Sequence, residues 1–278
     1  MRTNDACSVQ MAGYRGVLSQ SYHDPAFQQW LEELLRSQFT SYPPLRRARA
    51  REVYRLDSVM GEVYVKRYRV QTVKHGLRAR WHTHAAQKSW RIARFLLRQR
   101  IPTPQPVAYL AHWTSLFSGE QILLTEGISG GISLAEYINH NLAGSRLTVR
   151  EKRQLLQRVA EFVGRLHRIG VYHGDFTAEN ILVTPLSNGD FRVYLIDLDG
   201  VRSTRWISTR RRIKNLDELG RNFLDLRVIS TADRARFLKH YVRVYAKETR
   251  PFHHLFRLIW QRTQYRVQKH HTPFIGSR

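Results

Sequence analysis

A small set of polar residues in this sequence has the types and spacing needed to move a phosphate group. Asp175 ends the triplet His173-Gly-Asp, and Asn180 comes five residues later. Asp197 ends the apolar stretch VYLID, and Lys66 lies within EVYVKRY. In-line phosphoryl transfer needs a carboxylate that orients the attacking hydroxyl, oxygen ligands for Mg²⁺ and a cation beside the phosphates. The pattern predicts Asp175 as the base, Asn180 and Asp197 as Mg²⁺ ligands, and Lys66 as the phosphate cation.

Each of these residues also has an ordinary structural interpretation. Aspartate and asparagine are common turn residues, and a strand lysine in a basic chain is usually solvated. The strands expected on both sides of the loop, together with Asp197, favour chemistry for Asp175 and Asn180. The position of Lys66 in the order of the chain favours a functional role, whereas Asp199 is interpreted as a structural or capping residue.

The elements that would position Lys66 form a strand-rich segment that begins at Val53. Period-2 stretches rich in Val and Tyr indicate strands, and proline forbids helix. The expected elements are a hairpin over VYRLD and EVYVKRY with Lys66 near the end of its second strand, a basic helix over 85–100, an extended connector containing Pro102, Pro104 and Pro106, and strands over 107–113 and 121–127.

The elements that would position Asp175 and Asp197 follow a Gly-rich joint at 127–131 and are mainly helical. Capping boxes begin at Ser133 and Thr148, and the second one opens a long helix that stops at Gly170. Asn188-Gly189 predicts a tight hairpin turn just before Asp197. Further helices are expected from 215 onwards, including 215–229 and a segment capped by Thr231.

This order divides the chain into three parts. Residues 1–50 are expected to form an N-terminal helical extension, because Asp24-Pro25 is typical of a helix start. Residues 51–127 would form a small antiparallel-sheet lobe, and residues 128–278 a mainly helical lobe. The fold class predicted is α+β with two lobes.

Composition limits the environment and the partners. The chain has 278 residues, with 46 Lys plus Arg against 22 Asp plus Glu, a formal charge of +24. Such a charge attracts anions, and the 42% hydrophobic content disfavours disorder. Cys7 is the only cysteine, which excludes an internal disulfide and fits a reducing compartment. The apolar runs are too short to span a bilayer, so any membrane attachment is expected to be peripheral.

Longer stretches carry a resemblance to a known family. HGDFTAENILV and VYLIDLDGVR resemble the atypical branch of the protein-kinase-like fold. Together with SWRIARFLLRQRIPTPQPVAY, LTEGISGGISLAEYI and DELGRNFLDLRVISTADRARFLKHY, they look like the bacterial lipopolysaccharide kinase family, over about residues 53–245. Members of that family use ATP and Mg²⁺ to phosphorylate Kdo or heptose in the lipopolysaccharide inner core.

The resemblance implies roles for individual residues. Lys66 matches the phosphate-pairing lysine, Asp175 the catalytic aspartate, and Asn180 and Asp197 the Mg²⁺ ligands. The segment from Glu126 to Ile128 matches the backbone hinge that holds adenine. His173 would be a scaffold residue whose ring packs behind the metal loop.

Three departures from the kinase pattern are visible. The Gly-rich phosphate loop is absent, since VYRLDSVMGEVYV has a single glycine. No Asp or Glu occurs from residue 67 to 119, so the helix after Lys66 offers it no glutamate; Gln87 or Ser89 stands roughly at that place. Gly174 replaces the arginine that reads an activation-loop phosphate in regulated kinases, and we therefore expect no phosphorylation switch.

The basic residues suggest how an anionic substrate is met. Arginine and lysine in the acid-free segment are candidates to bind phosphate or carboxylate groups, against the simpler interpretation of a solvated face. These are Arg78, Arg80, Lys88, Arg91 and Arg94, and STRRRIK (208–214) is a second basic cluster that would meet acidic glycan. The expected partners are the lipopolysaccharide core or its lipid A-linked precursor and an anionic membrane surface, at the cytoplasmic face of the bacterial inner membrane. Nucleic acid is disfavoured because no motif supports it beyond charge.

Two other functions stay open at this point. One is an atypical kinase that acts on a protein or on a small molecule. The other is a catalytically weak kinase scaffold that binds anionic glycolipid. The absent Gly-rich loop and glutamate favour the scaffold, whereas Lys66, Asp175, Asn180 and Asp197 favour an enzyme.

Overall fold

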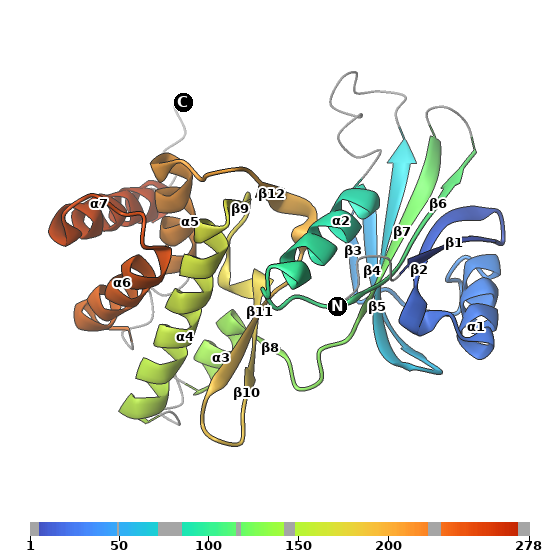
Figure 1. The fold of residues 1–278 in the computed structure, drawn as a ribbon, viewed down its shortest axis with the longest axis horizontal. Coiled ribbons are helices and arrows are strands. Elements are labelled where there is room, and N and C mark those ends of the chain that lie inside the picture. The colour runs from blue at the N-terminus through green and yellow to red at the C-terminus, as the bar shows by residue number, and fades with distance from the viewer. Residues whose placement is uncertain are drawn as a thin grey trace, which may run out of the picture. The chain divides into compact units, whose positions relative to one another are not determined.

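The chain folds into two compact units, each with its own core (Figure 1). The computed structural model describes residues 6–48, 50–71, 85–114, 118–141, 148–221 and 229–271. The first unit contains residues 1–98 and 103–129, and the second contains residues 99–102 and 130–278.

The first unit is built on an antiparallel sheet of seven strands. Their order is β1-β2-β6-β7-β5-β4-β3. The strands are β1 (Ala6–Met11), β2 (Tyr14–Ser19), β3 (Arg46–Ala48), β4 (Arg51–Ser58), β5 (Gly61–Gln71), β6 (Pro106–Trp113) and β7 (Ser118–Glu126). The predicted hairpin is present as β4 and β5, but Lys66 lies in the middle of β5 and not near its end.

Two helices cover opposite faces of this sheet. The helix α1 (Pro25–Arg36) contributes Phe27, Leu31 and Leu35 to a core that includes Val63 and Val65 of β5. The helix α2 (Ala85–Arg98) packs its buried stripe on the other face, in a cluster formed by Ala86, Trp90, Tyr68 and Leu123. Because side chains alternate along β5, Val63 and Tyr68 face opposite ways.

The first fifty residues are part of the sheet as well as helical. Asp24 caps α1 by accepting a hydrogen bond from Phe27 N–H (3.0 Å), with Pro25 in the first turn, as the sequence predicts. The prediction of a helical extension over residues 1–50 is wrong for residues 6–19, which form β1 and β2. Strand β2 pairs with β6, almost a hundred residues later in the chain, and such non-local pairing leaves no local sequence pattern. Strand β3 and the short 3₁₀ helix Gln20–Tyr22 were also not predicted.

The second unit is mainly helical, with two small sheets. Its helices are α3 (Leu134–Asn141), α4 (Val149–Arg168), α5 (Thr209–Arg221), α6 (Thr231–Tyr245) and α7 (Phe252–His271). One sheet has the order β11-β10-β8, and the other pairs β12 with β9. These strands are β8 (Ile132–Ser133), β9 (Val171–His173), β10 (Ile181–Pro185), β11 (Phe191–Leu195) and β12 (Val201–Ser203).

Local signals in this unit were mostly correct, with small shifts. Thr148 and Glu151 form the predicted capping box, and Gly189 has the positive φ (77°) expected of its hairpin turn. The helix expected from Asn215 begins earlier, at Thr209, and residues 222–228 lie outside the described part. Ser230, and not Thr231, caps α6, because its hydroxyl accepts from Asp233 N–H (3.1 Å). Within the described ranges, no helix combines the length and apolarity needed to cross a membrane.

The packing of α1 gives a test of its place in the core. Leu31 is fully buried, and Leu31→Ala should lower the free energy of unfolding by about 3 kcal/mol through lost burial and a cavity. Glu33→Ala, on the exposed face of the same helix, should change it by less than about 0.5 kcal/mol. Urea unfolding measures both values. Equal stability of the two variants would mean that α1 is only appended to the sheet.

Candidate active site

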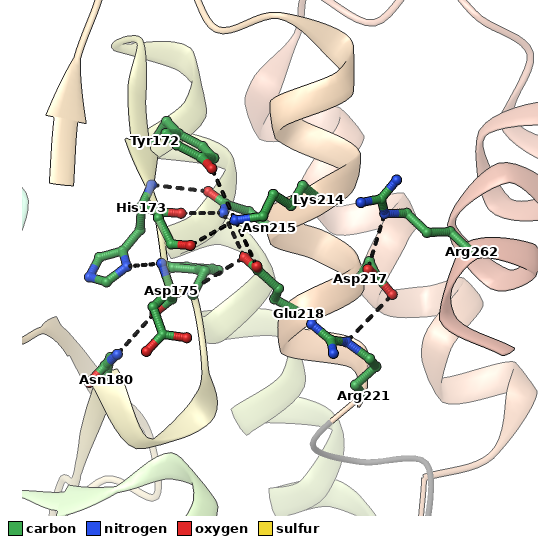
Figure 2. A network of polar contacts seen from close by, with 12 residues as sticks. Tyr172, His173, Asp175, Asn180, Lys214, Asn215, Asp217, Glu218, Arg221 and Arg262 are labelled. Carbon is green, nitrogen blue, oxygen red and sulfur yellow. Dashed lines mark hydrogen bonds and ion pairs between the residues drawn. The ribbon is translucent and has the colours of Figure 1, made fainter. Parts of the chain in front are cut away.

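The loop that carries Asp175 and Asn180 joins β9 to β10 in the second unit, and Figure 2 shows both side chains. Asp175 follows β9, and Asn180 ends the short 3₁₀ helix Ala178–Asn180. The Asn180 side-chain amide donates to the Asp175 carbonyl oxygen (2.9 Å), and the Asn180 carbonyl accepts from Ile196 N–H (2.9 Å). The Asp175 residue is exposed. The loop therefore presents a carboxylate to solvent on a backbone fixed at both ends.

The ring of His173 joins this loop to Asp197. His173 Nδ1 accepts from the Asp175 N–H (3.0 Å), and His173 Nε2 lies 2.9 Å from the Asp197 carbonyl oxygen. A carbonyl can only accept, so Nε2 carries the proton and Nδ1 does not. Burial lowers the pKa of His173, which keeps the ring neutral. The predicted scaffold role of His173 thus has a concrete form, a neutral imidazole hydrogen-bonded to the backbone of both acidic residues.

Asp197 has a left-handed backbone. It lies between β11 and a 3₁₀ helix (Leu198–Gly200), with φ 54° and ψ 66°. This region is uncommon for a residue other than glycine, and such strain persists where the surroundings hold it. The hydrogen bond between its carbonyl and His173 is one contact that does so.

Gly174 has a steric reason to be glycine. Its N–H donates to the Gly200 carbonyl (3.0 Å), where β9 and β12 run side by side. A Cβ on Gly174 would lie 3.3 Å from that carbonyl oxygen, which is tighter than ordinary contact. A side chain at this position would therefore require the Gly200 carbonyl to shift by a few tenths of an ångström.

Asn215 of α5 binds the backbone of His173 with two hydrogen bonds. Its Nδ2 donates to the His173 carbonyl (2.6 Å), and its Oδ1 accepts from the His173 N–H (3.2 Å). His167, at the end of α4, lies 3.4 Å from the same Oδ1 through Nε2 and 2.9 Å from the Tyr241 hydroxyl through Nδ1. Burial lowers the pKa of His167 to about 3, so this ring is neutral too.

Lys214 and Glu218 of α5 complete the contacts. Lys214 Nζ donates to the Gly174 carbonyl (2.7 Å) and to the Tyr172 hydroxyl (3.1 Å), and it forms an ion pair with Glu218 (2.8 Å). Glu218 also accepts from the Phe176 N–H (3.4 Å). Burial alone would lower the pKa of Lys214, but its hydrogen bonds to Glu218 and Tyr172 and the attraction of the Glu218 charge together outweigh burial and raise the pKa. Lys214 therefore stays charged.

These contacts of α5 were not predicted from the sequence. The cluster STRRRIK was expected to meet acidic glycan, but Arg212 is 3% exposed and pairs with Glu248 (2.8 Å), and Lys214 binds the Asp175 loop. The only local sign was the i,i+4 spacing of Lys214 and Glu218 on a helix. Deeper in the unit, the buried Asp217 pairs with Arg262 of α7 (3.1 Å), as Figure 2 shows.

The residues predicted to hold Mg²⁺ have suitable donor atoms. Since Asn180 Nδ2 donates to Asp175, the amide oxygen Oδ1 is the atom that a cation would meet. A carboxylate at Asp197 and an amide oxygen at Asn180 are the hard ligands that Mg²⁺ prefers. No cluster of three or more His, Cys, Asp or Glu that could hold a metal occurs in the described residues. The donor atoms of Asn180 and Asp197 are thus chemically suited to Mg²⁺.

Lys66 and the hinge residues belong to the first unit. Lys66 is half-buried and lies opposite Leu123 on β7, on the face that α2 covers. The backbone N–H of Glu126 donates to the Gln105 carbonyl (2.9 Å), and that of Gly127 to Glu62 (2.8 Å). The Glu126 carboxylate accepts from the Tyr22 hydroxyl (3.0 Å), a contact that the sequence did not reveal. Ile128 follows this segment and is half-buried.

The candidate anion-binding residues are only partly described. Arg78 and Arg80 lie outside the described residues. On α2, Arg91 is exposed, while Lys88 and Arg94 are half-buried, with the Arg94 guanidinium 5.9 Å from the centre of the Trp90 ring. Their contact with an anionic substrate stays a prediction.

Comparison with known proteins places this geometry in context. The model of the lipopolysaccharide kinase (Kdo/WaaP) family matches residues 32–241. The lipopolysaccharide core heptose(I) kinase WaaP of Pseudomonas aeruginosa is 30% identical over 176 residues, or 62% of this chain and 65% of that protein. The 3-deoxy-D-manno-octulosonic acid kinase of Xanthomonas axonopodis pv. citri is also 30% identical over 176 residues, with 59% of its length covered. The aligned part thus spans less than two thirds of both relatives.

A solved structure gives the fold. The chain is similar to WaaP in a complex with acyl carrier protein, with a TM-score of 0.65, 24% identity, and coverage of 84% of this chain and 92% of that one. This likeness confirms the predicted α+β protein-kinase-like fold.

The Lys214 contacts predict a measurable effect on stability. Lys214→Met removes a charged donor and leaves the buried Glu218 carboxylate without its cation, so the free energy of unfolding should fall by about 2 kcal/mol. Adding Glu218→Gln removes the uncompensated charge and should recover much of the loss. Lys247→Met is a matched control, because Lys247 also donates to a backbone carbonyl (Arg168, 3.3 Å) at an exposed site. Urea unfolding measures the free energy of unfolding of each variant. An equal loss in Lys214→Met and Lys247→Met would contradict the inference that Lys214 stabilises the Asp175 loop.

The two neutral histidines predict a pH dependence. Below about pH 6.5 the unfolded chain takes up protons at His167 and His173 that the folded protein does not bind, so stability is lost as the pH falls. His167, whose pKa is about 3, should by itself lower the free energy of unfolding by about 1.4 kcal/mol per pH unit between pH ~6 and ~4. Urea unfolding across this range measures the slope. A flat profile would mean that the rings are protonated in the fold.

Proposed function

Because the chain belongs to the lipopolysaccharide kinase (Kdo/WaaP) family, we propose that it transfers the γ-phosphoryl group of ATP to a sugar hydroxyl of the lipopolysaccharide inner core. The acceptor is Kdo or heptose, the two sugars named by the relatives. The observation that carries the proposal is the His173 ring, which bonds to the backbone of both Asp175 and Asp197. A buried neutral imidazole that joins the backbones of two acidic residues is not a feature of an ordinary turn, so it supports a functional role for the loop.

Asp175 would act on the acceptor. Its exposed carboxylate orients the sugar hydroxyl and takes its proton as the hydroxyl oxygen bonds to the γ-phosphorus. The bond between the γ-phosphorus and the bridging oxygen breaks, and ADP leaves with that oxygen. The Asn180–Asp175 hydrogen bond and the contacts from α5 keep the Asp175 backbone in one geometry, which lowers the entropic cost of alignment.

The remaining predicted residues would bind the nucleotide. Asn180 and Asp197 would hold Mg²⁺, which neutralises charge on the phosphates when bound. Lys66 would contact the α- and β-phosphates, and the backbone from Glu126 to Ile128 would hold adenine. Because the N–H groups of Glu126 and Gly127 are already used by Gln105 and Glu62, we assign adenine to the Glu126 carbonyl and the Ile128 backbone.

The cellular location of the enzyme is inferred from its proposed substrate. A kinase that acts on a lipid A-linked precursor works at the cytoplasmic face of the inner membrane, where basic residues of α2 such as Arg91 would meet anionic headgroups. The glycine at position 174 supports an enzyme without a phosphorylation switch, because the arginine that would read an activation-loop phosphate is absent from the sequence there.

Asp175→Asn tests the proposal. It keeps the size of the side chain but removes the proton acceptor, so phosphate transfer from labelled ATP to core glycolipid should fall by about 10³-fold or more, with unfolding unchanged. Glu179→Gln is the matched control, because Glu179 is an exposed carboxylate of the same loop and the change should leave turnover intact. Activity retained by Asp175→Asn would refute the assignment.

The choice of acceptor separates the remaining alternatives. Core glycolipid, a protein substrate and aminoglycosides can be offered in parallel with the same labelled ATP. Transfer only to protein or to a small molecule would overturn the sugar assignment but keep a kinase. ATP-dependent thermal stabilisation without transfer to any acceptor would indicate a binding scaffold.

A further inference from the structure

The first unit lacks the loop that normally covers the phosphates of ATP. In protein kinases a Gly-rich turn lies over the phosphates, and the phosphate-pairing lysine is on a following strand. The β4–β5 hairpin, whose sequence VYRLDSVMGEVYV has a single glycine, contains the strand of Lys66, and the sheet order β3-β4-β5 places another hairpin, β3–β4, directly before it. The sequence of that hairpin from residue 46 to 51 is RRARAR, with four arginines and no glycine. The question is which of these side chains can reach the phosphates.

The strand register gives the answer for Arg51. In the β4–β5 pair, Val53 lies opposite Lys66 and Arg51 lies opposite Tyr68. Side chains alternate along each strand, so Arg51 and Lys66 project from the same face. They are diagonal neighbours on adjacent strands, with Cβ atoms roughly 7 Å apart, a separation that long side chains bridge.

The ion pairs of Glu52 show which residues face the other way. Glu52, the residue after Arg51, is buried and pairs with Arg47 (3.0 Å) and Arg69 (3.1 Å). Glu52 also lies opposite Arg67 in the register, and their charged groups are 3.7 Å apart. These residues lie on the face that α1 covers, together with the buried Tyr54. Arg51 therefore faces the side of α2.

The face that Arg51 shares with Lys66 is the one suited to a nucleotide. Lys66 lies opposite Leu123, which packs with Ala86 and Trp90 of α2. The segment from residue 67 to 119 contains no acidic residue, so α2 brings no carboxylate to this face. Arg51 and Lys66 bring two cationic side chains to adjacent strands of this face, and a polyphosphate is an anion long enough to bind both.

We propose that Arg51 is a second phosphate-binding residue for ATP and takes over the role of the absent Gly-rich loop. A guanidinium offers planar, paired N–H donors that match two phosphate oxygens, which an ammonium does not. Lys66 and Arg51 would thus bind the triphosphate from neighbouring strands with side chains, in place of loop N–H groups. This inference rests on the proposed function, because it assumes that ATP is the ligand of this face.

The test is nucleotide affinity as a function of phosphate number. Calorimetric titration with adenosine, ADP and ATP in the presence of Mg²⁺ gives the three dissociation constants. Arg51→Met should weaken ATP about 10- to 100-fold, as expected for the loss of charged hydrogen bonds, weaken ADP less, and leave adenosine unchanged. Arg51→Lys keeps the charge but not the paired donors and should lie between Arg51→Met and the wild type.

Arg69→Met is the matched control. It removes the same charge from the next strand but on the opposite face, where Glu52 keeps Arg47 and Arg67 as partners. We expect its three affinities to equal those of the wild type, with thermal unfolding recorded for every variant. Equal loss of ATP affinity in Arg51→Met and Arg69→Met, or equal loss for adenosine and ATP, would overturn the Arg51 assignment and leave the kinase proposal standing. A folded wild type that binds neither adenosine nor ATP would overturn both.

Discussion

The neutral ring of His173 is the constraint on which the second unit depends. One nitrogen must accept from the Asp175 N–H while the other donates to the Asp197 carbonyl, and a protonated ring could not satisfy the first bond. Burial disfavours the charged form and so maintains this arrangement. Burying the polar His173 ring removes its hydrogen bonds to water. The loss is offset because both ring nitrogens form hydrogen bonds within the protein. One side chain thereby holds the backbones of Asp175 and Asp197, which lie in different segments of the chain.

Side chains of helix α5 stabilise the loop that contains His173 and Asp175. Only residues 198–208 separate Asp197 from the start of α5, and the helix then returns three side chains to the loop. Asn215 binds both backbone groups of His173, Lys214 binds the Gly174 carbonyl, and Glu218 accepts from Phe176. In switched kinases a phosphate orders the corresponding region. Here Lys214 and Glu218, which are charged residues of the chain itself, bind the loop.

Several acidic residues of this basic chain form ion pairs in the interior. Buried carboxylates at Glu52, Asp217, Asp233 and Glu248 each pair with arginine or lysine. A buried carboxylate without such a partner would be costly. Because these pairs are internal, the remaining excess of the +24 charge lies on the exterior. An anionic substrate or surface is the natural complement of that exterior.

Local patterns allowed the sequence to predict most of the elements, whereas the roles of Asp175, Asn180, Asp197 and Lys66 stay predictions. The spacing of Asp175 and Asn180, the capping box at Thr148 and the turn at Gly189 are set within a few residues, so they could be read directly. The sequence could not reveal the pairing of β2 with β6, the hydrogen bonds of Lys214 and Asn215 to the Asp175 loop, or the common face of Arg51 and Lys66. Each of these joins residues distant in the chain, and their energies depend on burial and register. Only the tertiary structure brings such groups together, which is why it shows Arg212 and Lys214 of STRRRIK engaged inside the unit while Arg210 stays exposed.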